Sequence, residues 1–193
     1  MTFQNEFTTT LQSIIPRQLA LPLRLFVQDE SRFGLLPVIR RRITLKGVKP
    51  IEPIQHVFEN YYLYGAIEPK SGDSFFLEMP FLDSHCYQIY LNEFSCWASD
   101  SFNIMVLDNG SFHKAKGLII PENVALLFLP PYSPELNPTE RLWEYIKNQI
   151  AGKLFQNLDS LKNEVAEVIK QLSKKMVASL TGYPYIIQAT NAL

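Results

Sequence analysis

Two continuous apolar segments, Asn103–Leu107 and Val124–Leu129, constrain the fold of this chain more than any other feature. A strand that faces solvent on one side alternates between apolar and polar residues, and these two segments do not alternate. Each therefore predicts a strand that is covered on both faces. Residues 113–118, which lie between them, predict a short helix. We expect a sheet with helices packed against both sides.

The rest of the chain places strands first and then alternates helices with strands. A turn signal at 70–73 predicts an antiparallel hairpin between two of the early strands. Asp83 or Ser84 caps a helix in the middle of the chain, another helix covers 140–150, and Asp159 caps a last helix that ends near Gly182. This order predicts an α/β fold, with a mixed β-sheet flanked by α-helices. The early strands are expected at 23–28, 41–45, 57–67 and 74–79.

Length and composition indicate a single domain. The chain has 193 residues, of which 47% are hydrophobic, enough to bury a full core. Residues 1–22 are polar and interrupted by proline, so we expect a lead-in outside the core and a domain over 23–193. Cys86 and Cys96 are ten residues apart on one predicted helix, too far to form a disulfide. No signal segment and no apolar run of about 20 residues is present, which predicts a reduced, cytoplasmic protein without a membrane span.

Three acidic residues stand at the ends of predicted elements. Asp29 follows the strand at 23–28, Asp108 follows the strand at 103–107, and Glu140 lies in the first turn of a helix. Ligands usually bind such sheets at the carboxyl ends of neighbouring strands, so the acids would meet if those strands lie side by side. Carboxylate oxygens are preferred ligands of Mg²⁺, and two such ions can assist displacement at a phosphate. The pattern predicts a site for divalent cations and phosphate chemistry.

Each acid also has an ordinary structural explanation. Asp29 is in a sequence typical of turns, and Asp108 could close an Asx turn or cap the next helix. Glu140 could complete a capping box with Asn137 as the N-cap residue. Four prolines between 130 and 138 favour the functional interpretation, because they fix a path that a cap alone does not need. They also stabilise the fold by restricting the unfolded chain.

Four stretches of the chain match one known family: Asp29–Gly34, Arg40–Arg42 with Lys46–Gly47, Leu107–Asn109 with His113, and Pro130–Trp143. Together they resemble the catalytic domain of DDE transposases of the mariner superfamily, most closely the bacterial insertion-sequence branch. The resemblance implies a ribonuclease H-like fold that cleaves and transfers DNA strands at transposon ends with two Mg²⁺ or Mn²⁺ ions. It implies that Asp29, Asp108 and Glu140 are the catalytic residues and the metal ligands.

The resemblance has one departure that bears on function. Such transposases carry an N-terminal helix-turn-helix region, and residues before Leu23 do not supply one. We therefore expect the catalytic half alone, with DNA, a second copy of the chain and a separately encoded N-terminal DNA-binding domain as partners. Two alternatives stay open. One is a truncated, non-catalytic fragment that acts as an interaction or dimerisation module, and the other is a generic ribonuclease H-like nuclease.

Several further residues have weaker assignments. Asn109 and His113 are predicted to orient Asp108 without binding the metal themselves. The basic run Arg40–Arg42 could contact DNA phosphates or could form a solvated hairpin edge, and we favour the contact with DNA. Tyr132 is expected to pack under its loop rather than to stack on a DNA base. The predicted DNA-binding residues are Arg40, Arg41, Arg42, Lys46 and Lys147.

Overall fold

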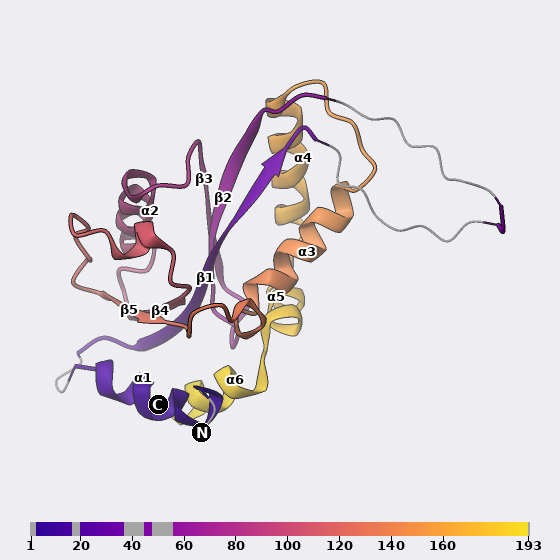
Figure 1. The fold of residues 1–193 in the computed structure, drawn as a ribbon. Coiled ribbons are helices and arrows are strands. Elements are labelled where there is room, and N and C mark those ends of the chain that lie inside the picture. The colour runs from indigo at the N-terminus through magenta and orange to yellow at the C-terminus, as the bar shows by residue number, and fades with distance from the viewer. Residues whose placement is uncertain (1–2, 17–19, 37–44, 48–55, 193) are drawn as a thin grey trace.

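The computed structural model describes residues 3–16, 20–36, 45–47 and 56–192. Arg40, Arg41 and Arg42 lie outside the described residues, as does most of the strand expected at 41–45. In the described part, a twisted sheet separates helix α2 from helices α3, α4 and α5 (Figure 1). Helices α1 and α6 pack together below the sheet in that view, which brings the two ends of the chain close to each other.

The sheet has five strands in the order β3-β2-β1-β4-β5. β1 pairs in parallel with β4, and β4 in parallel with β5, whereas β2 pairs in antiparallel fashion with both β1 and β3. This arrangement confirms the predicted mixed sheet and the predicted hairpin. The strands are β1 (Leu23–Gly34), β2 (Asn60–Ile67), β3 (Ser74–Met79), β4 (Phe102–Leu107) and β5 (Val124–Phe128).

Strand β1 is longer than predicted. It was expected to end at Gln28, so that Asp29 would follow it, but it continues to Gly34. Its parallel pairing with β4 stops at Val27, and residues 28–34 pair with β2 alone. That half of the strand no longer lies in the middle of the sheet, so it tolerates polar residues. The polar sequence of this half resembles that of a turn for the same reason.

Helix α2 (Ser84–Trp97) covers one face of the sheet, and it begins as predicted. The Asp83 side chain caps it by accepting a hydrogen bond from the Cys86 amide at 2.8 Å. Aromatic residues of α2 pack on Phe26 and Met105 in a compact cluster. The short helix predicted at 113–118 is a 3₁₀ helix, η1 (Ser111–Lys114), and lies earlier than expected.

The opposite face is covered by α3 (Thr139–Ile150), α4 (Leu158–Lys170) and α5 (Lys174–Thr181), and α6 (Pro184–Asn191) follows. The single helix predicted from Asp159 to Gly182 is therefore wrong. Asn157, not Asp159, caps α4, and it forms a capping box with Ser160. Ser173 then starts a second helix by accepting a hydrogen bond from the Met176 amide. These local caps divide a segment whose apolar periodicity is continuous.

Residues before β1 contribute to the core, contrary to the expected lead-in. They form α1 (Phe3–Ile14), in which Phe7 and Leu11 are fully buried. The Phe7 ring packs edge-on against Tyr185 of α6, with ring centroids 5.2 Å apart. Phe7 and Leu11, which are four residues apart and share one side of α1, are thus buried in the core, and Phe7 packs against α6, a helix distant in sequence.

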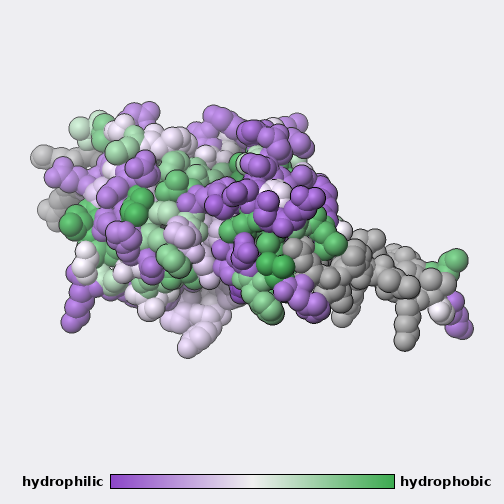
Figure 2. Space-filling view, turned by 90° about the horizontal axis from the view of Figure 1, so that it is seen from above, coloured by the Kyte–Doolittle hydropathy of each residue, from purple (hydrophilic) through white to green (hydrophobic). Residues whose placement is uncertain are grey.

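The described helices are all too short or too polar to span a membrane. Hydrophilic side chains dominate the face seen in Figure 2, with smaller hydrophobic areas between them. The larger of the two core clusters lies between the sheet and helices α3, α4 and α5, and it also includes residues of α1 and α6.

Candidate active site

All three predicted acids line one pocket of about 420 Å³. Asp29 comes from β1, Asp108 from the residue after β4, and Glu140 from the first turn of α3. The pairing of Val27 with Val106 places Asp29 and Asp108 at the same level of neighbouring strands. The pocket is completed by Asn109, Gly110, residues 129–134 and Asn137.

Asp29 faces helix α3. The indole Nε1 of Trp143 donates a hydrogen bond to Asp29 Oδ2 at 2.9 Å. Gly65, which pairs with Asp29 across the sheet, leaves room for this indole, since a Cβ atom there would lie 2.7 Å from Trp143 Cη2. Burial, together with the nearby charges of Glu30 and Glu140, raises the pKa of Asp29 well above its usual range. A positive charge in the pocket would reverse that effect.

Glu140 is exposed and does not cap its helix, so the capping-box alternative is wrong. Asn137, expected as the N-cap, has a different role. Its Nδ2 donates to the carbonyl oxygen of Gln28 at 2.9 Å, and its Oδ1 accepts from the Thr139 amide at 3.1 Å. Buried Asn137 thus joins the residue before Asp29 to the residue before Glu140. It fixes the start of α3 against β1.

Asp108 does form the Asx-type turn that was considered for it, and it still lines the pocket. Its Oδ1 accepts a hydrogen bond from the Gly110 amide at 2.8 Å. The same oxygen lies 2.9 Å from Nδ1 of His113. The turn interpretation and the site interpretation are compatible, because both contacts use Oδ1.

Glu30 is connected to Asp108 through His113, a link that the sequence did not reveal. His113 is buried, and its Nε2 lies 3.0 Å from Glu30 Oε1, so the ring bridges Glu30 and Asp108. Gln28 Nε2 also donates to Glu30 Oε1 at 2.6 Å. Burial opposes a charge on the ring, but the two carboxylates outweigh it and raise the pKa of His113 to about 9. Strand alternation could have indicated Glu30, because the neighbour of Asp29 in an extended strand must face the other side.

The remaining predicted residues lie away from the acids or hold the loop. Asn109 lines the pocket, but its Nδ2 donates to the Leu129 carbonyl and its Oδ1 accepts from Lys114 Nζ. It therefore fastens the loop more directly than it supports Asp108. Lys147 borders a second pocket, where its Nζ lies 5.6 Å from the centre of the Phe33 ring. Lys46 is an exposed turn residue that does not line the acidic pocket.

The acidic pocket has the donor chemistry of a hard-cation site. It offers carboxylate oxygens from three elements, and burial together with the charges of Glu30 and Glu140 raises the pKa of Asp29. Within the described ranges, however, no three His, Cys, Asp or Glu side chains are grouped closely enough to hold a metal ion. Asp108 and Glu140 are both exposed, so their carboxylates are open to solvent.

This chain is similar to a known protein family and to several known proteins. A family model described as DDE superfamily endonuclease matches residues 24–162. The uncharacterized protein y4pE/y4sA of Sinorhizobium fredii is 33% identical over 102 residues, covering 52% of this chain and 76% of that protein. The transposable element Tcb2 transposase of Caenorhabditis briggsae is 23% identical over 166 residues, covering 79% of this chain and 61% of that protein.

Solved structures share the fold. The Mos1 transposase in its paired-end complex with the left transposon end gives a TM-score of 0.70 at 15% identity, over 98% of this chain and 60% of that one. The Mos1 mariner paired-end complex with Mn gives 0.68 at 16% identity, over 97% of this chain and 57% of that one. The likeness confirms the ribonuclease H-like fold that the family resemblance implied. The chain spans about three fifths of the length of the Tcb2 and Mos1 proteins.

Proposed function

Because the chain belongs to the DDE superfamily endonucleases, we propose that it cleaves DNA strands at transposon ends and transfers them to a target, with Asp29, Asp108 and Glu140 as its metal ligands. The observation that carries this proposal is that three separate elements bring these acids to one pocket. A mere turn acid or helix cap would have no reason to share a pocket with the other two.

Divalent cations suit this pocket. Mos1 mariner complexes have been solved with Mn and with Mg, and carboxylates are the ligands that such ions prefer. When bound, a pair of these ions would activate the attacking oxygen and stabilise the leaving oxygen in an in-line displacement at phosphorus. The two-ion stoichiometry is part of our proposal.

The protein's own residues would hold the acids in place for this chemistry. Trp143 anchors one oxygen of Asp29, and Asn137 fixes the helix that carries Glu140. At Asp108, the Gly110 amide and His113 both contact Oδ1, so Oδ2 is the oxygen offered to a cation. Asp29 and Asp108 would thus each be oriented by contacts to one oxygen that leave the other available, whereas Glu140 would be positioned through its helix.

The proposed substrate is DNA at a transposon end. Mos1 has been captured with its left transposon end and in a strand transfer complex. We propose that an N-terminal DNA-binding region acts together with this catalytic domain to recognise the DNA end. A second copy of the chain would hold the other end of the element. The basic residues Arg40, Arg41, Arg42, Lys46 and Lys147 would contribute phosphate contacts.

Plasmid nicking tests the proposal. The chain is incubated with supercoiled DNA and Mg²⁺ or Mn²⁺, alone and with a DNA-binding domain supplied in trans. Asp29→Asn, Asp108→Asn and Glu140→Gln should each lower nicking at least about 100-fold, because losing even an outer-shell partner of a metal site costs about 10- to 100-fold. The matched control is Glu135→Gln, an exposed acid of the same loop that does not line the pocket.

Two outcomes would contradict the proposal. If Glu140→Gln nicked as well as the parent chain, Glu140 would not be a catalytic residue. If the parent failed to nick under every condition, the chain would be the non-catalytic interaction module instead.

A further inference from the structure

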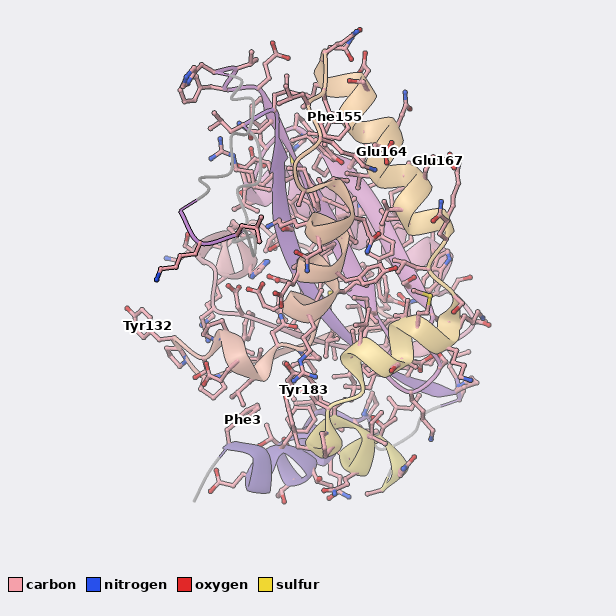
Figure 3. The ribbon with its side chains drawn as sticks, turned by 90° about the vertical axis from the view of Figure 1, so that its right-hand side faces the viewer. Phe3, Tyr132, Phe155, Glu164, Glu167 and Tyr183 are labelled. Atoms are coloured by element: carbon pink, nitrogen blue, oxygen red, sulfur yellow. The ribbon has the colours of Figure 1, made fainter. Side chains whose placement is uncertain are left out.

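Tyr132 has a conformation and an exposure that the proposed chemistry does not explain. Its φ angle is 57°, in the left-handed region, and it is the one non-glycine residue with positive φ in the described part of the chain. Its side chain is fully exposed, with 101% of its reference area open to solvent. Figure 3 shows the ring projecting outward from the body of the protein. The expectation that Tyr132 packs under its loop is therefore wrong.

The loop that carries Tyr132 is held at both ends. At its start, the Leu129 amide donates to the Leu107 carbonyl at 2.8 Å, and Asn109 donates to the Leu129 carbonyl. At its end, a 3₁₀ helix, η2 (Pro134–Leu136), leads into buried Asn137. Prolines at 130, 131 and 134 restrict the chain in between. The ring is thus presented from a fixed backbone, so little loop entropy is lost when it binds something.

The ring stands at the mouth of the acidic pocket. Tyr132 and Ser133 line that pocket together with the three carboxylates. A phosphodiester positioned at the acids would bring its flanking nucleotide to this side of the loop. We infer that Tyr132 stacks on an unpaired DNA base next to the phosphate that is cut, an inference that rests on the proposed function.

Stacking can bind DNA here although the charges of this region attract it only weakly. The chain has a net charge of −1, and the pocket itself carries three acids, so charge attraction to DNA is weak at this position. An aromatic face binds any base, because every base has a π surface, and the interaction does not depend on charge. A protein partner fits less well, since Tyr132 is the one large exposed hydrophobic residue among those that line the pocket.

Photo-crosslinking tests the inference directly. A DNA duplex with a short single-stranded overhang carries 5-iodouracil at the first unpaired position, and the parent chain is irradiated with it in Mg²⁺. The covalent crosslink captures even weak complexes, and mass spectrometry identifies the crosslinked peptide. We expect the crosslink on Tyr132. Crosslinks elsewhere, or none, would overturn the inference.

Affinity measurements with matched variants separate the ring from the fold. Tyr132→Leu should bind the overhang DNA about 5- to 150-fold more weakly, the loss of one stacked base, whereas Tyr132→Trp should bind like the parent. Tyr132→Gly removes the ring and also relieves the left-handed backbone, so it should lose affinity without losing thermal stability. Phe81→Leu, at an exposed aromatic residue outside the pocket, serves as the control.

Failure of this inference can be distinguished from failure of the proposed function. If the parent nicks plasmid but Tyr132→Leu binds and nicks equally well, the stacking role is wrong while the catalytic assignment stands. If the crosslink forms on Tyr132 but the parent never nicks, stacking stands and catalysis fails. If Tyr132→Leu instead changes the mass of the chain's oligomer in solution, the ring serves a protein contact and the inference is overturned.

Discussion

Asn137→Ala should destabilise the protein more than the loss of an ordinary helix cap. The Asn137 side chain is 4% exposed and makes two hydrogen bonds, to the Gln28 carbonyl and from the Thr139 amide. Both partner residues are fully buried, so water cannot replace the side chain. An unpaired buried polar group costs about 1–3 kcal/mol, and the two losses together should cost about 2–4 kcal/mol.

The natural control is Asn157→Ala. Asn157 caps α4 with a bond from the Ser160 amide at 2.8 Å, but it is exposed and has no tertiary partner among its side-chain bonds. Its loss should cost about 1 kcal/mol. Urea unfolding, followed by tryptophan fluorescence, compares the two variants with the parent chain. Glu140→Gln should differ little from the parent, because Glu140 is exposed and makes no cap bond.

DNA nicking provides a second measurement on the Asn137→Ala variant. If Asn137 fixes α3 against β1, then Asn137→Ala should lower nicking at temperatures where the variant is still folded, because Glu140 moves with the helix. An Asn137→Ala variant that is no less stable than Asn157→Ala would refute the tether. Asn137 would then be a simple turn residue.

Two more predictions concern residues that contact or pair with Asp29 and Asp108. Gly65→Ala should lower the free energy of unfolding by about 1–3 kcal/mol, because the added Cβ would lie 2.7 Å from Trp143 Cη2 and the buried indole cannot move away freely. Thermal unfolding measures this loss. Gly117→Ala is the control, because its Cβ would meet nothing within 4 Å. The raised pKa of His113 stabilises the fold fully below its unfolded value of 6.5, and this contribution is lost as the pH rises through about 9. Unfolding measured in EDTA from pH 6 to 10 should therefore show a loss of up to about 3 kcal/mol in that window, which should be absent in His113→Gln.

Local sequence patterns predicted two strands, the start of one helix and the positions of the three acids. Continuous apolar runs predicted β4 and β5, since a strand covered on both faces needs no polar alternation. Asp83 predicted the start of α2, because a cap is a contact between residues close in sequence. The three acids were found at the positions that line the pocket, although their roles stay predictions. All of these features depend on local patterns.

The tertiary structure decided everything that joins distant segments. Strand pairing determined that β1 continues past Asp29, which turned Glu30 toward His113, 83 positions away. Packing on α6 made α1 part of the core, and a bond to Gln28 made Asn137 a tether rather than a cap. Exposure of Tyr132 likewise depends on what the fold places beneath its loop. A side chain's sequence neighbourhood restricts its backbone, but its partners come from elements that approach through space, and no local pattern encodes them.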